Sequence, residues 1–135
     1  MFLSSVPTFD EFAEIVDEEV RLLPSYALEG LEGGVLVDPS AYLHPARVAD
    51  DLYILGTYSM GITGHQIVLY YGSFMAASGF CSREALRARI RETLRHEILH
   101  HLETRAGLYY KGSLIEEDRE RMRRYYESHM KGKKD

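Results

Sequence analysis

Two histidines and a glutamate in the C-terminal half of the chain have a spacing that suits metal chemistry. Residues 96–101 read H-E-I-L-H-H, which contains the pattern H-E-x-x-H. Residues four apart stack on one face of a helix, so His96 and His100 could bind one Zn²⁺ while Glu97 reaches a metal-bound water as general base. These residue types at this spacing predict the active site of a metallopeptidase.

The surrounding sequence predicts that the motif lies on a helix. Residues 82–106 contain no Gly or Pro, Ser82 suits an N-cap, and Gly107 suits the end of the helix. The helix would carry an apolar stripe made by Leu86, Ile90, Leu94, Ile98 and Leu102. His96, His100 and Glu103 lie within about 60° of one another on a different side. One face is therefore expected to pack into the core, and the other is left for a metal.

Length and composition limit the class of protein. The 135 residues predict one domain over residues 1–130, followed by a basic tail, residues 131–135, that we expect to be disordered. The single cysteine, Cys81, excludes an internal disulfide framework and fits a reducing cytosol. The start lacks a signal-peptide core and no segment reaches about 20 apolar residues. We therefore expect a cytoplasmic protein with no membrane association.

The charge distribution bears on the partners. The net charge of −5 argues against nucleic acid as the main partner. Five arginines nevertheless precede the motif: Arg83, Arg87, Arg89, Arg91 and Arg95. We interpret them as solvated or as partners of acidic side chains elsewhere in the chain. The sequence contains no coiled-coil pattern, and the oligomeric state stays open.

The order of predicted elements indicates an α+β domain. Thr8 and Glu11 form a capping-box pattern for a helix that runs to about residue 23. Residues 35–37, 52–58 and 65–74 are β-rich, and the last two of these segments are separated by a Gly-containing turn. Residues 113–116 open a last helix to about residue 129. Helices packed against a small, mainly antiparallel or mixed sheet follow from this order.

These segments together resemble the small bacterial zincin-like metallopeptidase family, whose members are little more than a minimal zincin domain. The resemblance rests on F-D-E-F at residues 9–12, L-P at 23–24, L-G-T-Y at 55–58, I-V-L-Y at 67–70 and H-E-I-L-H-H at 96–101. It implies a zinc-dependent peptidase with His96 and His100 as metal ligands and Glu97 as general base and proton shuttle. It also implies that residues 67–70 form an edge strand that pairs with an extended substrate peptide, and that His101 supports the site or packs.

The third metal ligand does not follow from this resemblance. Many family members continue the motif as H-E-x-x-H-H-x-G-x-x-D, whereas Glu103 and Ala106 stand at the Gly and Asp positions here. Glu103, on the metal face, is the first candidate for the third ligand, and Asp118 on the last helix is the alternative. Glu117 and Glu120 are further substitutes.

Two functions remain open at this point. We expect a zinc peptidase that acts on a peptide or protein substrate; the alternative is a metal-binding or peptide-binding module that kept the helix but lost efficient catalysis, which the missing Gly and Asp favour. Among the other candidates, His44 and His65 are interpreted as structural. Tyr109 and Tyr110, next to the motif, are candidates for stabilising the oxyanion.

Overall fold

The structure is a computed structural model that describes residues 6–49, 51–78, 81–107 and 114–133, without the side chains of residues 114–119 and 130–133. In this part the elements follow the order α1 (Phe9–Arg21), α2 (Ser25–Leu28), β1 (Gly34–Asp38), β2 (Gly56–Gly61), β3 (Gly64–Tyr70), α3 (Tyr71–Ser78), α4 (Arg83–Ala106) and α5 (Leu114–Lys133). The predicted α+β class is confirmed. No helix of the described residues is both long enough and apolar enough to cross a membrane.

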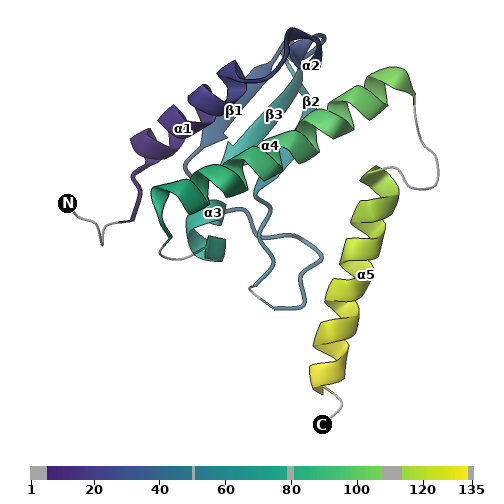
Figure 1. The fold of residues 1–135 in the computed structure, drawn as a ribbon. Coiled ribbons are helices and arrows are strands. Elements are labelled where there is room, and N and C mark those ends of the chain that lie inside the picture. Colours follow the sequence, from purple (N-terminus) through teal and green to yellow (C-terminus); the bar gives the residue numbers. More distant parts are fainter. Residues whose placement is uncertain (1–5, 50, 79–80, 108–113, 134–135) are drawn as a thin grey trace.

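The sheet is mixed and has the strand order β1-β3-β2 (Figure 1). β1 runs parallel to β3, and β2 runs antiparallel to it in a hairpin. β3 is therefore the central strand, and the expectation that residues 67–70 form an open edge is wrong. The apolar run suits a central strand because Ile67 and Leu69 are fully buried in the core. Among the described residues, the strand of this hairpin with an open edge is β2.

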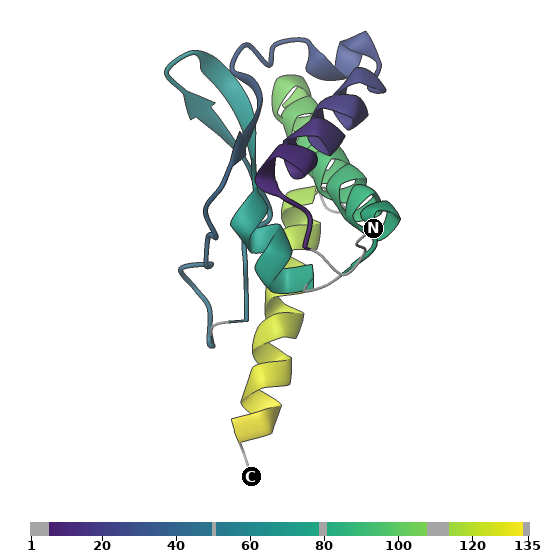
Figure 2. The same ribbon diagram turned by 90° about the vertical axis from the view of Figure 1, so that its left-hand side faces the viewer.

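Helices α1 and α4 cover one face of the sheet (Figure 2). Phe12 and Ile15 of α1 pack there with Ile67 and Leu69 of β3. The apolar stripe predicted for α4 is confirmed, since its side chains are buried except for half-buried Leu102. Burial of this stripe fixes the rotation of α4 about its own axis. The opposite face of α4, which carries the histidines of the motif, is thereby turned away from the core.

The ends of α1 and α4 agree with the capping signals in the sequence. Thr8 and Glu11 form both hydrogen bonds of the capping box. The Ser82 side chain accepts a hydrogen bond from the Ala85 N–H, and Gly107 ends α4 with a left-handed φ of 69°. Glycine adopts this conformation without a steric penalty. The motif therefore lies on one uninterrupted helix, as predicted.

Several boundaries differ from the prediction. Of the predicted β segment 52–58, β2 contains only residues 56–58, and it continues to Gly61. β3 ends at Tyr70, so the predicted strand over residues 71–74 is wrong, and α3 begins there instead. Tyr71 and Phe74 pack against aromatic rings of α1, a tertiary contact that local β propensity does not register. At the other end of the chain, α5 continues to Lys133, through part of the predicted disordered tail. Residues 113 and 134–135 lie outside the described residues.

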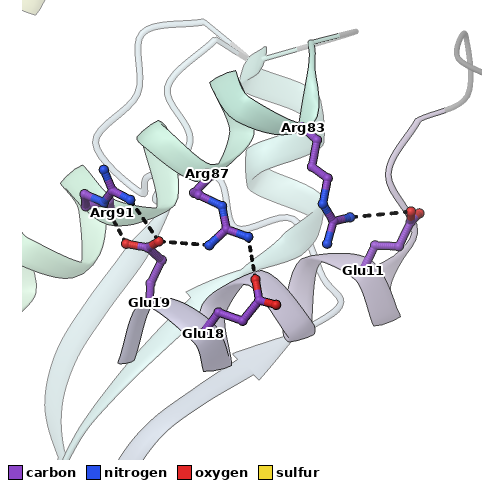
Figure 3. Close-up of polar contacts among 6 residues, drawn as sticks. All are labelled: Glu11, Glu18, Glu19, Arg83, Arg87 and Arg91. Atoms are coloured by element: carbon purple, nitrogen blue, oxygen red, sulfur yellow. Dashed lines mark hydrogen bonds and ion pairs between the residues drawn. The ribbon is translucent and has the colours of Figure 1, made fainter. Parts of the chain in front are cut away.

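Ion pairs join α1 to the N-terminal half of α4 (Figure 3). Glu19 is 3% exposed and accepts hydrogen bonds from Arg91 and Arg87 at 2.7 to 3.0 Å. Arg87 also pairs with Glu18, and Arg83 lies 3.8 Å from Glu11. The hydrogen bonds from Arg91 hold the pKa of Glu19 below its ordinary value against the opposing effect of burial, and Arg87 adds to the lowering. These arginines have the intramolecular partners that the sequence suggested.

Candidate active site

The histidine face of α4 forms one wall of a cleft with a volume of about 990 Å³. Residues 52–57, at and before the start of β2, form another part of the lining. Arg121 and Met122 of α5 complete it, together with His44. The cleft therefore lies where three segments far apart in the sequence meet, and His96, Glu97 and His100 all line it.

The imidazole rings of His96 and His100 have a separation that suits one metal ion. Their ring centres lie 5.0 Å apart with an angle of 78° between the ring planes. Two imidazoles on one tetrahedral Zn²⁺, at a Zn–N distance of about 2.1 Å, have ring centres about 5 Å apart. Both histidines are half-buried, and Glu97 beside them is only 8% exposed. The arrangement can present two nitrogen ligands and one sheltered carboxylate to the same part of the cleft.

None of the candidates for the third metal ligand completes a metal site with the two histidines in the described part of the chain. Glu103 is not among the residues that line the cleft, although it lies three residues beyond His100 on the same helix. Within the described ranges, no three His, Cys, Asp or Glu side chains gather closely enough to hold a metal ion. Glu120 is an exposed side chain that pairs with Arg123. Asp118 and Glu117 are in α5, and their side chains lie outside the described residues.

The open edge of β2 runs into the cleft. The carbonyl of Leu55 accepts a hydrogen bond from the N–H of Tyr70, so residue 55 and alternate residues after it face β3. The backbone groups of Gly56, Tyr58 and Met60 consequently point away from the sheet. Gly56 also lies against α4, because a Cβ atom there would be 3.0 Å from Cγ2 of Thr93. This close approach puts an open strand edge beside the histidine face of α4.

His101 is buried in the core and does not line the cleft. It is fully buried, with Nε2 2.6 Å from the carbonyl oxygen of Glu29 and Nδ1 2.8 Å from the hydroxyl of Tyr58. A carbonyl only accepts, so Nε2 donates to Glu29, and the hydroxyl of Tyr58 is the partner of Nδ1. The ring of His65 stacks on Tyr58, and its Nδ1 lies 3.0 Å from the same hydroxyl. Both histidines therefore hold α4 against β2 and β3.

His44, which the sequence led us to interpret as structural, is a cleft residue. Its Nδ1 accepts a hydrogen bond from the N–H of Ala46 at 3.0 Å, so the neutral imidazole carries its proton on Nε2. The backbone N–H of His44 donates to the carbonyl of Leu52 at 2.9 Å, which fixes this residue beside the start of β2. No local pattern reveals this position, because it depends on pairing between residues 42–44 and 52–54. Tyr109 and Tyr110, the predicted oxyanion candidates, lie outside the described residues.

Contacts of α5 with residues 46–49 and with Asp51 hold the far wall of the cleft. The hydroxyl of Tyr125 accepts from the N–H of Val48 at 2.9 Å and donates to Asp51 at 3.0 Å. His129 lies 2.6 Å from the other carboxylate oxygen of Asp51, and this hydrogen bond lowers the pKa of Asp51. Tyr126 donates to the carbonyl of Ala46. Side chains near the C-terminal end of α5 thus keep its earlier turns against the cleft.

The chain is similar over most of its length to a protein of known structure. A conserved hypothetical protein from Thermus thermophilus is 34% identical, with a TM-score of 0.64, and the match covers 74% of this chain and 98% of that chain. The chain belongs to the family of that protein. Its name states no activity. No family model and no curated protein matches the sequence.

Proposed function

We propose that this protein is a zinc-dependent peptidase of the minimal zincin type. The observation that carries the proposal is the pair of imidazoles, His96 and His100, whose ring centres lie 5.0 Å apart in the wall of a cleft, next to the buried carboxyl group of Glu97. A helix that served only as a solvated surface would need neither this separation nor a sheltered carboxylate. We also propose a cytoplasmic location, in keeping with the free thiol of Cys81.

The proposed zinc ligands are His96, His100 and Asp118. We favour Asp118 over Glu103 because α5 contributes Arg121 and Met122 to the cleft, and Asp118 precedes them by three and four residues on the same helix. Glu103 stays the alternative. When bound, Zn²⁺ would polarise the scissile carbonyl and lower the pKa of its water to about 7.

The residues of the chain have separate roles in this proposal. Glu97 accepts a proton from the attacking water and passes it to the leaving amine. The Nε2–H of His44 donates a hydrogen bond to the oxygen of the carbonyl under attack. The outward backbone groups of Gly56 and Tyr58 pair with an extended substrate, as in the addition of a strand to a sheet edge. The strand that binds the peptide is thus β2, rather than residues 67–70.

The alternative function is a metal-binding or peptide-binding module without efficient catalysis. It is favoured by Glu103 and Ala106, which stand where related motifs have Gly and Asp. The two functions differ in how the metal is held, since three protein ligands and a water favour the enzyme and four protein ligands favour a structural site.

Elemental analysis of purified protein tests the metal site first. We expect about one zinc per chain, lost in His96→Ala and in Asp118→Ala. Glu97→Ala is the matched control, because it removes a carboxylate from the same helix without removing a proposed ligand. Loss of zinc in Glu103→Ala instead would name the alternative ligand. Wild-type protein that holds no zinc after careful reconstitution would contradict the proposed function.

A further inference from the structure

The arginines of α4 fall into two groups that the sequence does not distinguish. Arg83, Arg87 and Arg91 face α1 and have carboxylate partners there (Figure 3). Arg89 and Arg95 line the cleft instead. Within the part of the chain that the structure describes, neither forms a hydrogen bond or an ion pair. The first group has a structural role, because its ion pairs join α4 to α1. The second group has no such role in the described part of the chain.

The carboxylate nearest to these two arginines in sequence does not form an ion pair with them. Glu92 also lines the cleft and is three residues from each arginine, a spacing at which side chains on a helix can meet. No ion pair joins Glu92 to either one among the described residues. The cleft therefore presents exposed positive charge in a chain whose net charge is −5.

The position of Arg89 relative to His96 determines how far from the scissile bond a peptide residue bound by Arg89 would lie. Arg89 precedes His96 by seven residues, so it lies on the same face of α4 and about 10.5 Å away along the axis. An extended peptide advances about 3.3 Å per residue. A peptide that runs beside α4 with its scissile bond at His96 would consequently bring a residue about three positions away to Arg89.

We propose that the cleft selects acidic peptides and that Arg89 is the residue that binds the acidic group of the peptide. The ligand is a carboxylate, either of an Asp or Glu side chain or of the peptide's C-terminus, about three residues from the bond that is cut. Arginine suits this task because its planar guanidinium can bind both oxygens of a carboxylate. The inference rests on the proposed function for the position of the scissile bond, but the preference for acidic ligands can be measured by binding alone.

Binding of short peptides to a protein that cannot cut them is the direct test. The probes are fluorescein-labelled Ala/Gly octapeptides with one Glu at each position in turn, and a matched set with Lys, each with a free or an amidated C-terminus. Fluorescence anisotropy is measured with zinc-loaded Glu97→Gln protein. We expect the best Glu peptide to bind about fivefold more tightly than its Lys counterpart, the size expected for one exposed ion pair.

Charge reversal assigns the preference to one residue. Arg89→Glu, combined with Glu97→Gln, should reverse the order so that the Lys peptides bind more tightly. Arg124→Glu is the matched control, because Arg124 is an exposed arginine of α5 outside the cleft, and it should keep the preference for Glu. Preference for a free C-terminus over an amide, also lost in Arg89→Glu, would identify the terminal carboxylate as the group that binds.

Cleavage by protein that retains Glu97, with products identified by mass spectrometry, separates the two proposals. Cleavage with a Glu preference that peaks about three residues from the cut bond supports both. Tight binding of Glu peptides with no cleavage of any peptide supports the charge selection and contradicts the peptidase. Equal binding of the Glu and Lys sets, or a preference that Arg89→Glu leaves unchanged, overturns the role of Arg89 whatever the activity.

Discussion

Replacing Glu19 with Gln should destabilise the domain, although Glu19 lies far along the sequence from the motif. The carboxylate is 3% exposed and accepts hydrogen bonds from Arg91 Nε at 2.7 Å, from Arg91 Nη2 at 3.0 Å and from Arg87 at 2.9 Å. Glutamine keeps the shape but loses the charge and one acceptor oxygen. Each hydrogen bond to a charged group contributes up to about 3 kcal/mol.

Partial rehydration of the arginines reduces this loss. The Arg91 side chain is 60% exposed and that of Arg87 is 29% exposed, so both can recover contacts with water. We therefore expect a decrease of about 3 kcal/mol in the free energy of unfolding, which is less than the sum of the separate hydrogen bonds. For a domain of this size, that corresponds to a decrease of roughly 10 °C in Tm.

Urea denaturation followed by circular dichroism measures this change, and Glu18→Gln is the matched control. Glu18 is the neighbouring residue and also pairs with Arg87, but its side chain is 40% exposed, so its replacement should have a much smaller effect. Equal losses in the two variants at neutral pH would refute the reasoning, because burial of the carboxylate would then have no consequence.

The same pair of proteins should differ less in acid. The pKa of Glu19 is lowered in the folded state, chiefly by Arg91, so its contribution is fully present above the unfolded pKa of about 4.3. It is lost as the pH falls through the folded value, because the carboxylate then takes up a proton. The gap between wild type and Glu19→Gln should consequently narrow below about pH 4. A gap that stays constant into strong acid would contradict the ion-pair explanation.

Two further predictions concern the cleft. Gly56→Ala should lower the free energy of unfolding by about 1–3 kcal/mol, because its Cβ would lie 2.8 Å from Leu69 and 3.0 Å from Thr93. Gly61→Ala is the control, since the nearest atoms to its Cβ belong to the flexible end of Gln66. It should lower the free energy of unfolding by less in the same urea denaturation assay. His44→Ala should lower kcat by about 10²–10³-fold with unchanged zinc content, and His44→Gln should recover part of this rate by restoring an N–H donor. Equal rates in the two His44 variants would contradict the proposed hydrogen bond from His44 to the substrate carbonyl.

The element that carries the motif was predictable because its signals are local. Ser82 and Gly107 act through hydrogen bonds and backbone conformation within one turn of the helix ends. The apolar stripe repeats with the period of the helix, so its burial followed from the sequence as well. The same holds for the capping box of Thr8 and Glu11.

Positions that depend on pairing between distant segments were not predictable. The run at residues 67–70 reads as β, but its central place depends on β1 pairing from the other side. Tyr71 begins a helix because its ring packs on α1, which overrides local β propensity. His44 reaches the cleft through pairing with residue 52 and through docking of α5. These contacts join residues whose separation along the chain leaves no periodic pattern.

The sequence by itself determined that His96 and His100 share one face of a helix with Glu97 beside them, because residues four apart stack once a helix is assigned. Tertiary structure alone decided what surrounds these residues: which strand has an exposed edge, which helix lines the cleft, and which arginines have carboxylate partners. Arg89 and Arg91 illustrate the difference. They are two residues apart and chemically identical, yet rotation of about 200° around α4 directs one to the cleft and the other to Glu19.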